Sequence, residues 1–96
     1  MAQDKRVFVV VLDREGEGVR EEVNERLENR ASLVYRVSST VFMVSEFGLS
    51  KDIAEMAGIK GDDRIPDATG AVFRIDSYSG FTDRALWEWL NNVEAS

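Results

Sequence analysis

The feature that most limits the fold of this 96-residue chain is a run of six consecutive apolar residues, VFVVVL, at positions 7–12. A strand with one face toward water alternates apolar and polar residues, whereas a strand covered on both faces is apolar throughout. The run is also far shorter than the roughly 20 residues that a membrane-spanning helix needs. Residues 6–12 therefore predict a central strand of a sheet, and residues 40–46, TVFMVSE, predict a second one.

Helical patterns mark three further segments. In residues 18–30, Val19, Val23 and Leu27 recur every four residues, which is typical of the buried stripe of a surface helix. Ser50 is the expected N-cap of a short helix over 51–57, and Gly58 is expected to end it in a left-handed conformation. Thr82 is the expected N-cap of a last helix, in which the apolar residues follow helical spacing: Leu86, Trp89, Leu90 and Val93.

The predicted order of elements indicates the fold. Residues 32–37 and 71–76 alternate like strands, and they carry Arg36 and Arg74. The order β-α-β-β-α-β-α predicts two interleaved right-handed crossovers. We expect an α+β, ferredoxin-like sandwich in one domain over residues 1–96: a four-stranded antiparallel sheet of order 4-1-3-2, two helices on one face and an additional C-terminal helix. The arginine-bearing strands then lie at the edges and the fully apolar strands at the centre.

This architecture leaves one face of the sheet to be explained. Two helices cover one face, yet the central strands present apolar side chains to the other face as well. A contiguous apolar patch on a small protein marks an interface or a site covered by another element. The third helix or a second copy of the chain could supply that cover, and a homodimer is the leading expectation.

Composition excludes several classes of function. The chain has no histidine and no cysteine, so neither Ser-His-Asp and Cys-His catalysis nor a zinc site built from those ligands is available. The net charge of −6 disfavours a broad nucleic-acid footprint. No signal-peptide pattern and no membrane span is apparent, so a cytoplasmic protein is the default expectation.

Asp13 is the candidate residue for chemistry, because it directly follows the first strand, where the side chains of loops converge. In a two-fold dimer, two such carboxylates could share Mg²⁺ or Mn²⁺ and activate water. The alternative is that Asp13 simply begins a turn. Asp62, Asp63 and Asp67 lack the spacing of a calcium loop and are expected to form a solvated acidic loop.

Aromatic residues near the end of the chain are the other candidates. Tyr78 and Phe81 lie in the SYSGF segment before the last helix and are expected to pack over the edge of the core. Trp87 falls at the border of the last helix's apolar stripe, where a half-exposed aromatic residue suits a protein interface. Arg14, Arg36 and Arg74 complete the set of candidate interface residues, Arg14 being the candidate phosphate contact.

Four stretches of the sequence carry a resemblance to a known family. They are VFVVVLD, SSTVFMVSE, LSKDIAEMAGIKGDDRI and the segment from AVFRIDSYSGF to TDRALWEWL. In this layout the chain resembles the small ferredoxin-fold subunit of the CRISPR spacer-acquisition machinery (Cas-two-like) and its stand-alone bacterial relatives. The chain departs from that subunit in being acidic and in having a predicted helix where the subunit has an extra C-terminal strand.

The resemblance implies a homodimer, and two functions are compatible with it. One is a non-catalytic interaction or regulatory protein without a cofactor, with a protein partner and a link to prokaryotic or phage defence. The alternative is a divalent-metal-dependent endonuclease acting on RNA or DNA, in which Asp13 corresponds to the metal-binding aspartate. The acidic composition and the lack of histidine favour the non-catalytic function.

Overall fold

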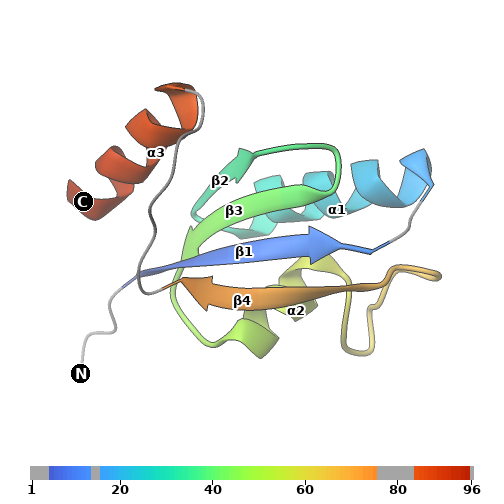
Figure 1. Ribbon diagram of the computed structural model, residues 1–96. Coiled ribbons are helices and arrows are strands. Elements are labelled where there is room, and N and C mark those ends of the chain that lie inside the picture. Colours follow the sequence, from blue (N-terminus) through green and yellow to red (C-terminus); the bar gives the residue numbers. More distant parts are fainter. Residues whose placement is uncertain (1–4, 14–15, 76–83, 96) are drawn as a thin grey trace.

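The computed structural model describes residues 5–13, 16–75 and 84–95. Its elements are β1 (Arg6–Leu12), α1 (Glu17–Arg30), β2 (Leu33–Arg36), β3 (Val41–Glu46), α2 (Ser50–Ala57), β4 (Gly70–Ile75) and α3 (Arg84–Ala95). The strands pair antiparallel in the order β2-β3-β1-β4, which confirms the predicted order (Figure 1). The fold is therefore ferredoxin-like, with α3 as the additional C-terminal helix.

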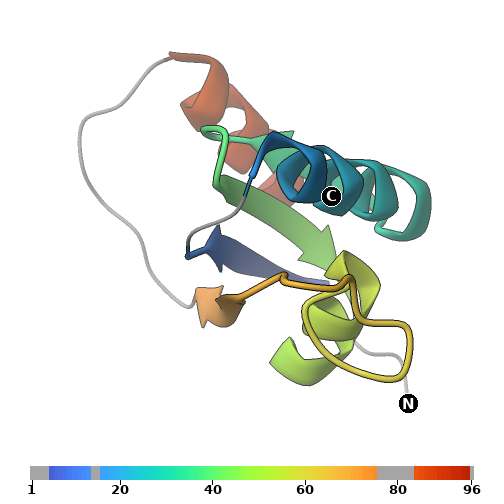
Figure 2. The same cartoon turned by 90° about the vertical axis from the view of Figure 1, so that its right-hand side faces the viewer.

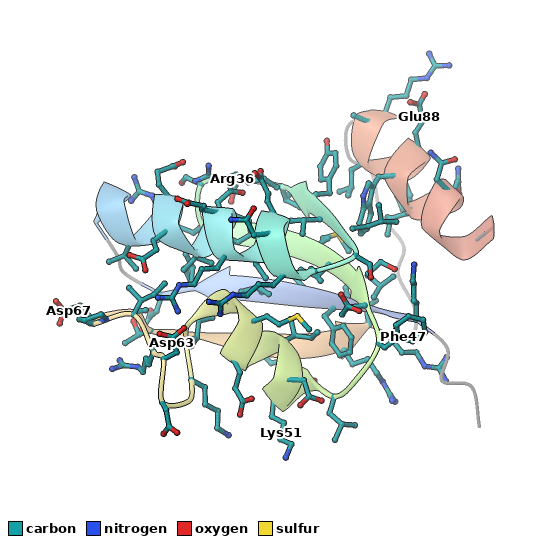
Figure 3. The ribbon with its side chains drawn as sticks, turned by 180° about the vertical axis from the view of Figure 1, so that it is seen from behind. Arg36, Phe47, Lys51, Asp63, Asp67 and Glu88 are labelled. Carbon is teal, nitrogen blue, oxygen red and sulfur yellow. The ribbon has the colours of Figure 1, made fainter. Side chains whose placement is uncertain are left out.

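Alternate residues of the central strands form the main core under α1 and α2, which lie on the same face of the sheet (Figures 1 and 3). From α1, Val23 and Leu27 of the predicted stripe are fully buried, and Val19 packs beside them. From the sheet, this face buries Phe8, Val10, Leu12, Phe42 and Val44. The apolar residues in the first and third strands that point the other way make no contribution to this core.

The ends of the second helix differ in part from the prediction. Ser50 is the first residue of α2, and the N-cap is Leu49, so the prediction of Ser50 as the cap is wrong. The carboxylate of Asp52 accepts a hydrogen bond from the Leu49 N–H at 2.7 Å, which satisfies a donor at the helix start without a polar cap residue. Gly58 ends the helix with φ of 84°, as predicted. Thr82, the expected cap of the last helix, lies outside the described residues.

The segment between α2 and β4 is irregular, as predicted, but it is packed rather than merely solvated. Ile65 and Ala68 are buried against the main core. The guanidinium of Arg26 donates to the backbone carbonyl of Asp63 at 2.6 Å, and Arg30 lies 3.2 Å from the Asp63 carboxylate. Two arginines of α1 thus fasten this loop to the helix layer.

A buried carboxylate joins two connections that the sequence pattern did not link. Glu46, at the end of β3, is only 8% exposed. Its carboxylate accepts hydrogen bonds from the backbone N–H of Ser32 at 2.6 Å, from the Ser32 hydroxyl and from the N–H of Phe47 at 3.0 Å. These bonds offset the cost of burying the carboxylate. Glu46 therefore holds the α1–β2 connection against the end of β3.

The lengths and compositions of the helices test the expectation that the chain has no membrane span. Among the described residues, no helix combines the length and the apolar character that a membrane span requires.

Candidate functional site

The face of the sheet opposite α1 and α2, called here the open face, is apolar almost throughout. The register of the strands arranges its side chains in three rows that run across the sheet. The rows are Leu33–Ser45–Val7–Ile75, then Tyr35–Met43–Val9–Phe73, and finally Val41–Val11–Ala71. Buried Ser45 interrupts the first row, and its Oγ has no hydrogen-bond partner among the described residues.

Helix α3 covers part of the open face. Its buried residues Leu86 and Leu90 pack with Met43 in a second, smaller core cluster, joined by partly buried apolar residues: Val7, Tyr35, Ile75, Trp87 and Trp89. The rings of Tyr35 and Trp89 lie 6.0 Å apart between centroids. Figures 1 and 2 show α3 near β2 and β3 and away from β4. The helix therefore covers the middle of the first row and the part of the second row that belongs to β2 and β3, whereas Leu33, at the β2 end of the first row, is 42% exposed.

Toward β4 and along the third row, the open face is left uncovered by the described residues. We call this part the uncovered strip and define it as Val9, Val11, Val41, Ala71 and Phe73. Phe73 is 56% exposed and Val11 is 36% exposed, which is unusual for large apolar side chains on neighbouring strands. The sequence indicated that Ala71 and Phe73 share one face of the sheet, since they alternate with Val72 and Arg74. It did not show how much of that face α3 would cover.

A shallow hollow of about 470 Å³ lies at the β4 side of the uncovered strip. Its lining comes from the end of β1 and from the start of β4: Val11, Leu12, Asp13, Thr69, Gly70, Ala71 and Phe73. Gly70 allows the close approach of β4 to β1 beside this hollow, because a Cβ at this position would collide with the backbone carbonyl of Val11. The strip thus combines a projecting aromatic side chain with a depression beside it.

Asp13 lies at the rim of this hollow, immediately after β1, and it is exposed. Its backbone N–H donates to the carbonyl of Thr69 at 2.9 Å, which extends the β1–β4 ladder by one residue. Within the described residues, no three carboxylates come together in a group that could hold a metal ion. Arg14, its predicted neighbour in phosphate binding, lies outside the described residues.

Arg36 takes part in contacts within the chain. Its guanidinium binds both carboxylate oxygens of Glu21, at 2.8 and 3.3 Å, and lies over the ring of Phe42 at 5.3 Å from the centroid. The hydrogen bonds from Arg36 lower the pKa of Glu21 below its ordinary value. In Figure 3, Arg36 lies beside α1, and its contacts tie that helix to the β2–β3 turn.

The other predicted site residues do not converge on one place. Arg74 is exposed on β4 and points to the helix face of the sheet, opposite in direction to Phe73. Trp87 is half-buried in the cluster under α3, as is Trp89. Tyr78 and Phe81 lie outside the described residues.

The aspartates of the acidic loop, Asp62, Asp63 and Asp67, are exposed, and Asp63 also makes ion pairs within the chain. The Asp63 carboxylate lies within 3.4 Å of Arg26 and 3.2 Å of Arg30, so its charge is balanced by two guanidinium groups (Figure 3). Asp67 adopts a left-handed conformation with φ of 68°, which aspartate tolerates better than most residues. A second hollow of about 610 Å³ near this loop has both acidic and basic residues in its lining, including Arg30, Lys60 and Asp62. It does not present one sign of charge to a ligand.

Comparison of the chain with protein-family models, with curated proteins and with solved structures found no match.

Proposed function

We propose that this protein is a non-catalytic, homodimeric interaction module, and that the uncovered strip is the surface on which a second copy binds. The observation that carries the proposal is the incomplete cover of the open face. Helix α3 protects Met43 and Tyr35, while Phe73 on β4 and Val11 on β1 remain exposed. Burying such side chains stabilises an interface by about 1.5–3 kcal/mol for each large side chain removed from water.

The charge of the chain favours this surface for self-association. At a net charge of −6, two copies repel each other wherever their acidic surfaces meet. The five residues of the uncovered strip carry no charge, so two copies can approach there with the least electrostatic cost. Asp13 is at the margin of the strip rather than within it. The interaction therefore relies on apolar burial, as in the core of permanent dimer interfaces.

The metal-dependent endonuclease remains a prediction from the sequence alone. One carboxylate, that of Asp13, stands at the hollow, and the described part of the chain brings no group of carboxylates to it. A shared metal would require the partner's Asp13 to lie beside the first, on the two-fold axis. The position of that axis therefore distinguishes the two functions.

Light scattering of the purified protein tests the proposal. We expect a mass of twice the 10.8 kDa of the chain at micromolar concentration, falling toward that of the monomer on dilution. A monomer mass throughout the concentration series would contradict the proposal. So would open-ended growth to large particles, because a two-fold interface closes at two copies.

A further inference from the structure

We infer that the second copy joins by antiparallel pairing of β4 with the partner's β4, with the two-fold axis at Val72, so that one continuous sheet runs through both copies. This inference rests on the proposed homodimer and specifies how it is built. An edge strand directs alternate backbone N–H and C=O groups away from its sheet, where a further strand can pair with them.

The two edges of the sheet differ in how well they suit such pairing. The strand at one edge, β2, has four residues, lies under α3 through the contact of Tyr35 with Trp89, and has its Arg36 engaged by Glu21. At the other edge, β4 has six residues, has no proline and carries one charged side chain. Natural proteins guard their edges by shortening, charging or covering them. Among the described residues, those features are present at β2 and few of them at β4.

The ladder between β1 and β4 fixes which backbone groups of β4 point outward. The Asp13 N–H points toward β4, to Thr69, whereas the Leu12 N–H points toward β3, to Thr40. These directions alternate along an antiparallel strand. The backbone N–H and C=O groups that point toward β4 therefore belong to Val7, Val9 and Val11. Their partners on β4 are Ala71, Phe73 and Ile75. The backbone groups of the intervening residues, including Gly70 and Val72, therefore point away from β1.

The outward groups select the register. Opposite residues of an antiparallel pair lie on the same face, so a two-fold axis must pass through a residue and not between two. An axis at Val72 pairs Val72 with the partner's Val72 and Gly70 with the partner's Arg74, within the observed strand. In that register all three outward-pointing residues of β4 have partners within the strand. An axis at Phe73 would pair only Val72 and Arg74, because Gly70 would then lie opposite residue 76, beyond the end of β4. An axis at Arg74 would place two guanidinium groups face to face, which is unfavourable.

The same register matches the two side chains of the uncovered strip that lie on β4, Ala71 and Phe73. With the axis at Val72, Phe73 of each copy lies opposite the partner's Ala71 on the open face. Phe73 is the most exposed aromatic side chain on the described strands, and the hollow of about 470 Å³ adjoins Ala71. The projecting ring of each copy therefore lies opposite the hollow of the other copy. This self-complementarity is what a two-fold interface requires.

This arrangement has a consequence for Asp13. Asp13 is next to Thr69, three residues along the ladder from Val72, and β1 is one strand inward from β4. With strands about 4.8 Å apart and a rise of about 3.4 Å per residue, the two Asp13 positions would lie roughly 25 Å apart. One metal ion cannot bridge that distance. The edge-paired dimer is therefore incompatible with a metal shared by two Asp13 carboxylates.

Disulfide trapping tests the register, and the absence of cysteine from the chain makes it free of background. An Ala71→Cys variant is mixed with a Phe73→Cys variant under mild oxidation, which leaves one native Phe73–Ala71 contact in the mixed dimer. Opposite residues at this kind of site have Cα atoms about 4.5 Å apart, within reach of a disulfide. In a dimer of one variant alone, the two cysteines stand at the same position of the two copies. Their Cα atoms are then about 8 Å apart, which is too far for a disulfide.

We expect the mixture to form covalent dimers at least about tenfold faster than either variant alone, since only the mixture meets the distance requirement. The pair Thr69→Cys and Ile75→Cys, which leaves both Phe73 side chains in place, should do the same. Failure of both mixtures, with the parent protein dimeric by light scattering, would overturn the β4 pairing and leave the proposed homodimer standing. A monomeric parent protein would overturn both.

Discussion

Replacement of Phe73 by aspartate is expected to convert the dimer to a monomer while the fold is retained. The side chain is 56% exposed in the single chain, so its loss removes little from the core of the monomer. In the edge-paired dimer each of the two rings would pack beside the partner's Ala71, and removing a large apolar side chain from water stabilises the interface by up to about 1.5–3 kcal/mol. Loss of both ring contacts, together with the placement of two carboxylates beside the partner's Ala71, should weaken dimerisation by about 100-fold. Sedimentation of parent and variant over a concentration series measures this.

Leu49→Asp is the matched control for this experiment. Leu49 is 62% exposed, but it precedes α2 and lies outside the uncovered strip. The substitution introduces the same charge and removes a comparable exposed apolar side chain. We expect Leu49→Asp to remain dimeric. If both variants dissociate equally, the effect is one of charge and not of the surface that we assign.

Replacement of Phe42 by alanine is expected to lower the free energy of unfolding by about 3–5 kcal/mol. Phe42 is fully buried near the start of β3, between Val10 of β1 and Arg36 of β2. Its removal leaves a cavity in the main core and deprives the Arg36 guanidinium of the ring beneath it. For a small domain with a total stability of roughly 5–15 kcal/mol, that is a large fraction. Denaturant unfolding at a fixed protein concentration provides the measurement.

Phe47→Ala is the control for the core substitution. The Phe47 side chain is 43% exposed and contacts Lys5 rather than the main core. The same change of residue should therefore cost less than about 1 kcal/mol there, as for other exposed positions. Equal losses at positions 42 and 47 would show that the face assigned to the main core is wrong.

The sheet could be predicted because the pattern of the strands has one consistent solution. The two segments that are apolar on both faces had to be central, and the segments that carry Arg36 and Arg74 had to be edges. The sequence also indicated that the open face would need cover. The sequence could not predict which part of that face α3 covers and which part is left for another occupant. Helical periodicity shows which side of a helix is apolar but not where the helix docks.

Several contacts had no periodic signal in the sequence. Ile65 and Ala68 are buried from within an irregular loop, where neither a helical nor a strand pattern applies. Glu46 looks like a polar residue at the end of a strand, and only the folded chain brings Ser32 to its carboxylate. Arg36 was a candidate interface residue, yet its guanidinium is bound by Glu21 from another element. Each of these depends on a partner that is distant in the sequence.

Amide hydrogen exchange along β4 tests most directly whether this edge of the sheet is the interaction surface. In a single copy the Phe73 N–H faces β1, while the Val72 N–H points outward, so Phe73 should exchange slowly and Val72 rapidly. At concentrations where the protein is dimeric, we predict that Val72 becomes as protected as Phe73, and that dilution to the monomer restores its rapid exchange. Rapid exchange at Val72 in a protein that is dimeric by mass would contradict this account.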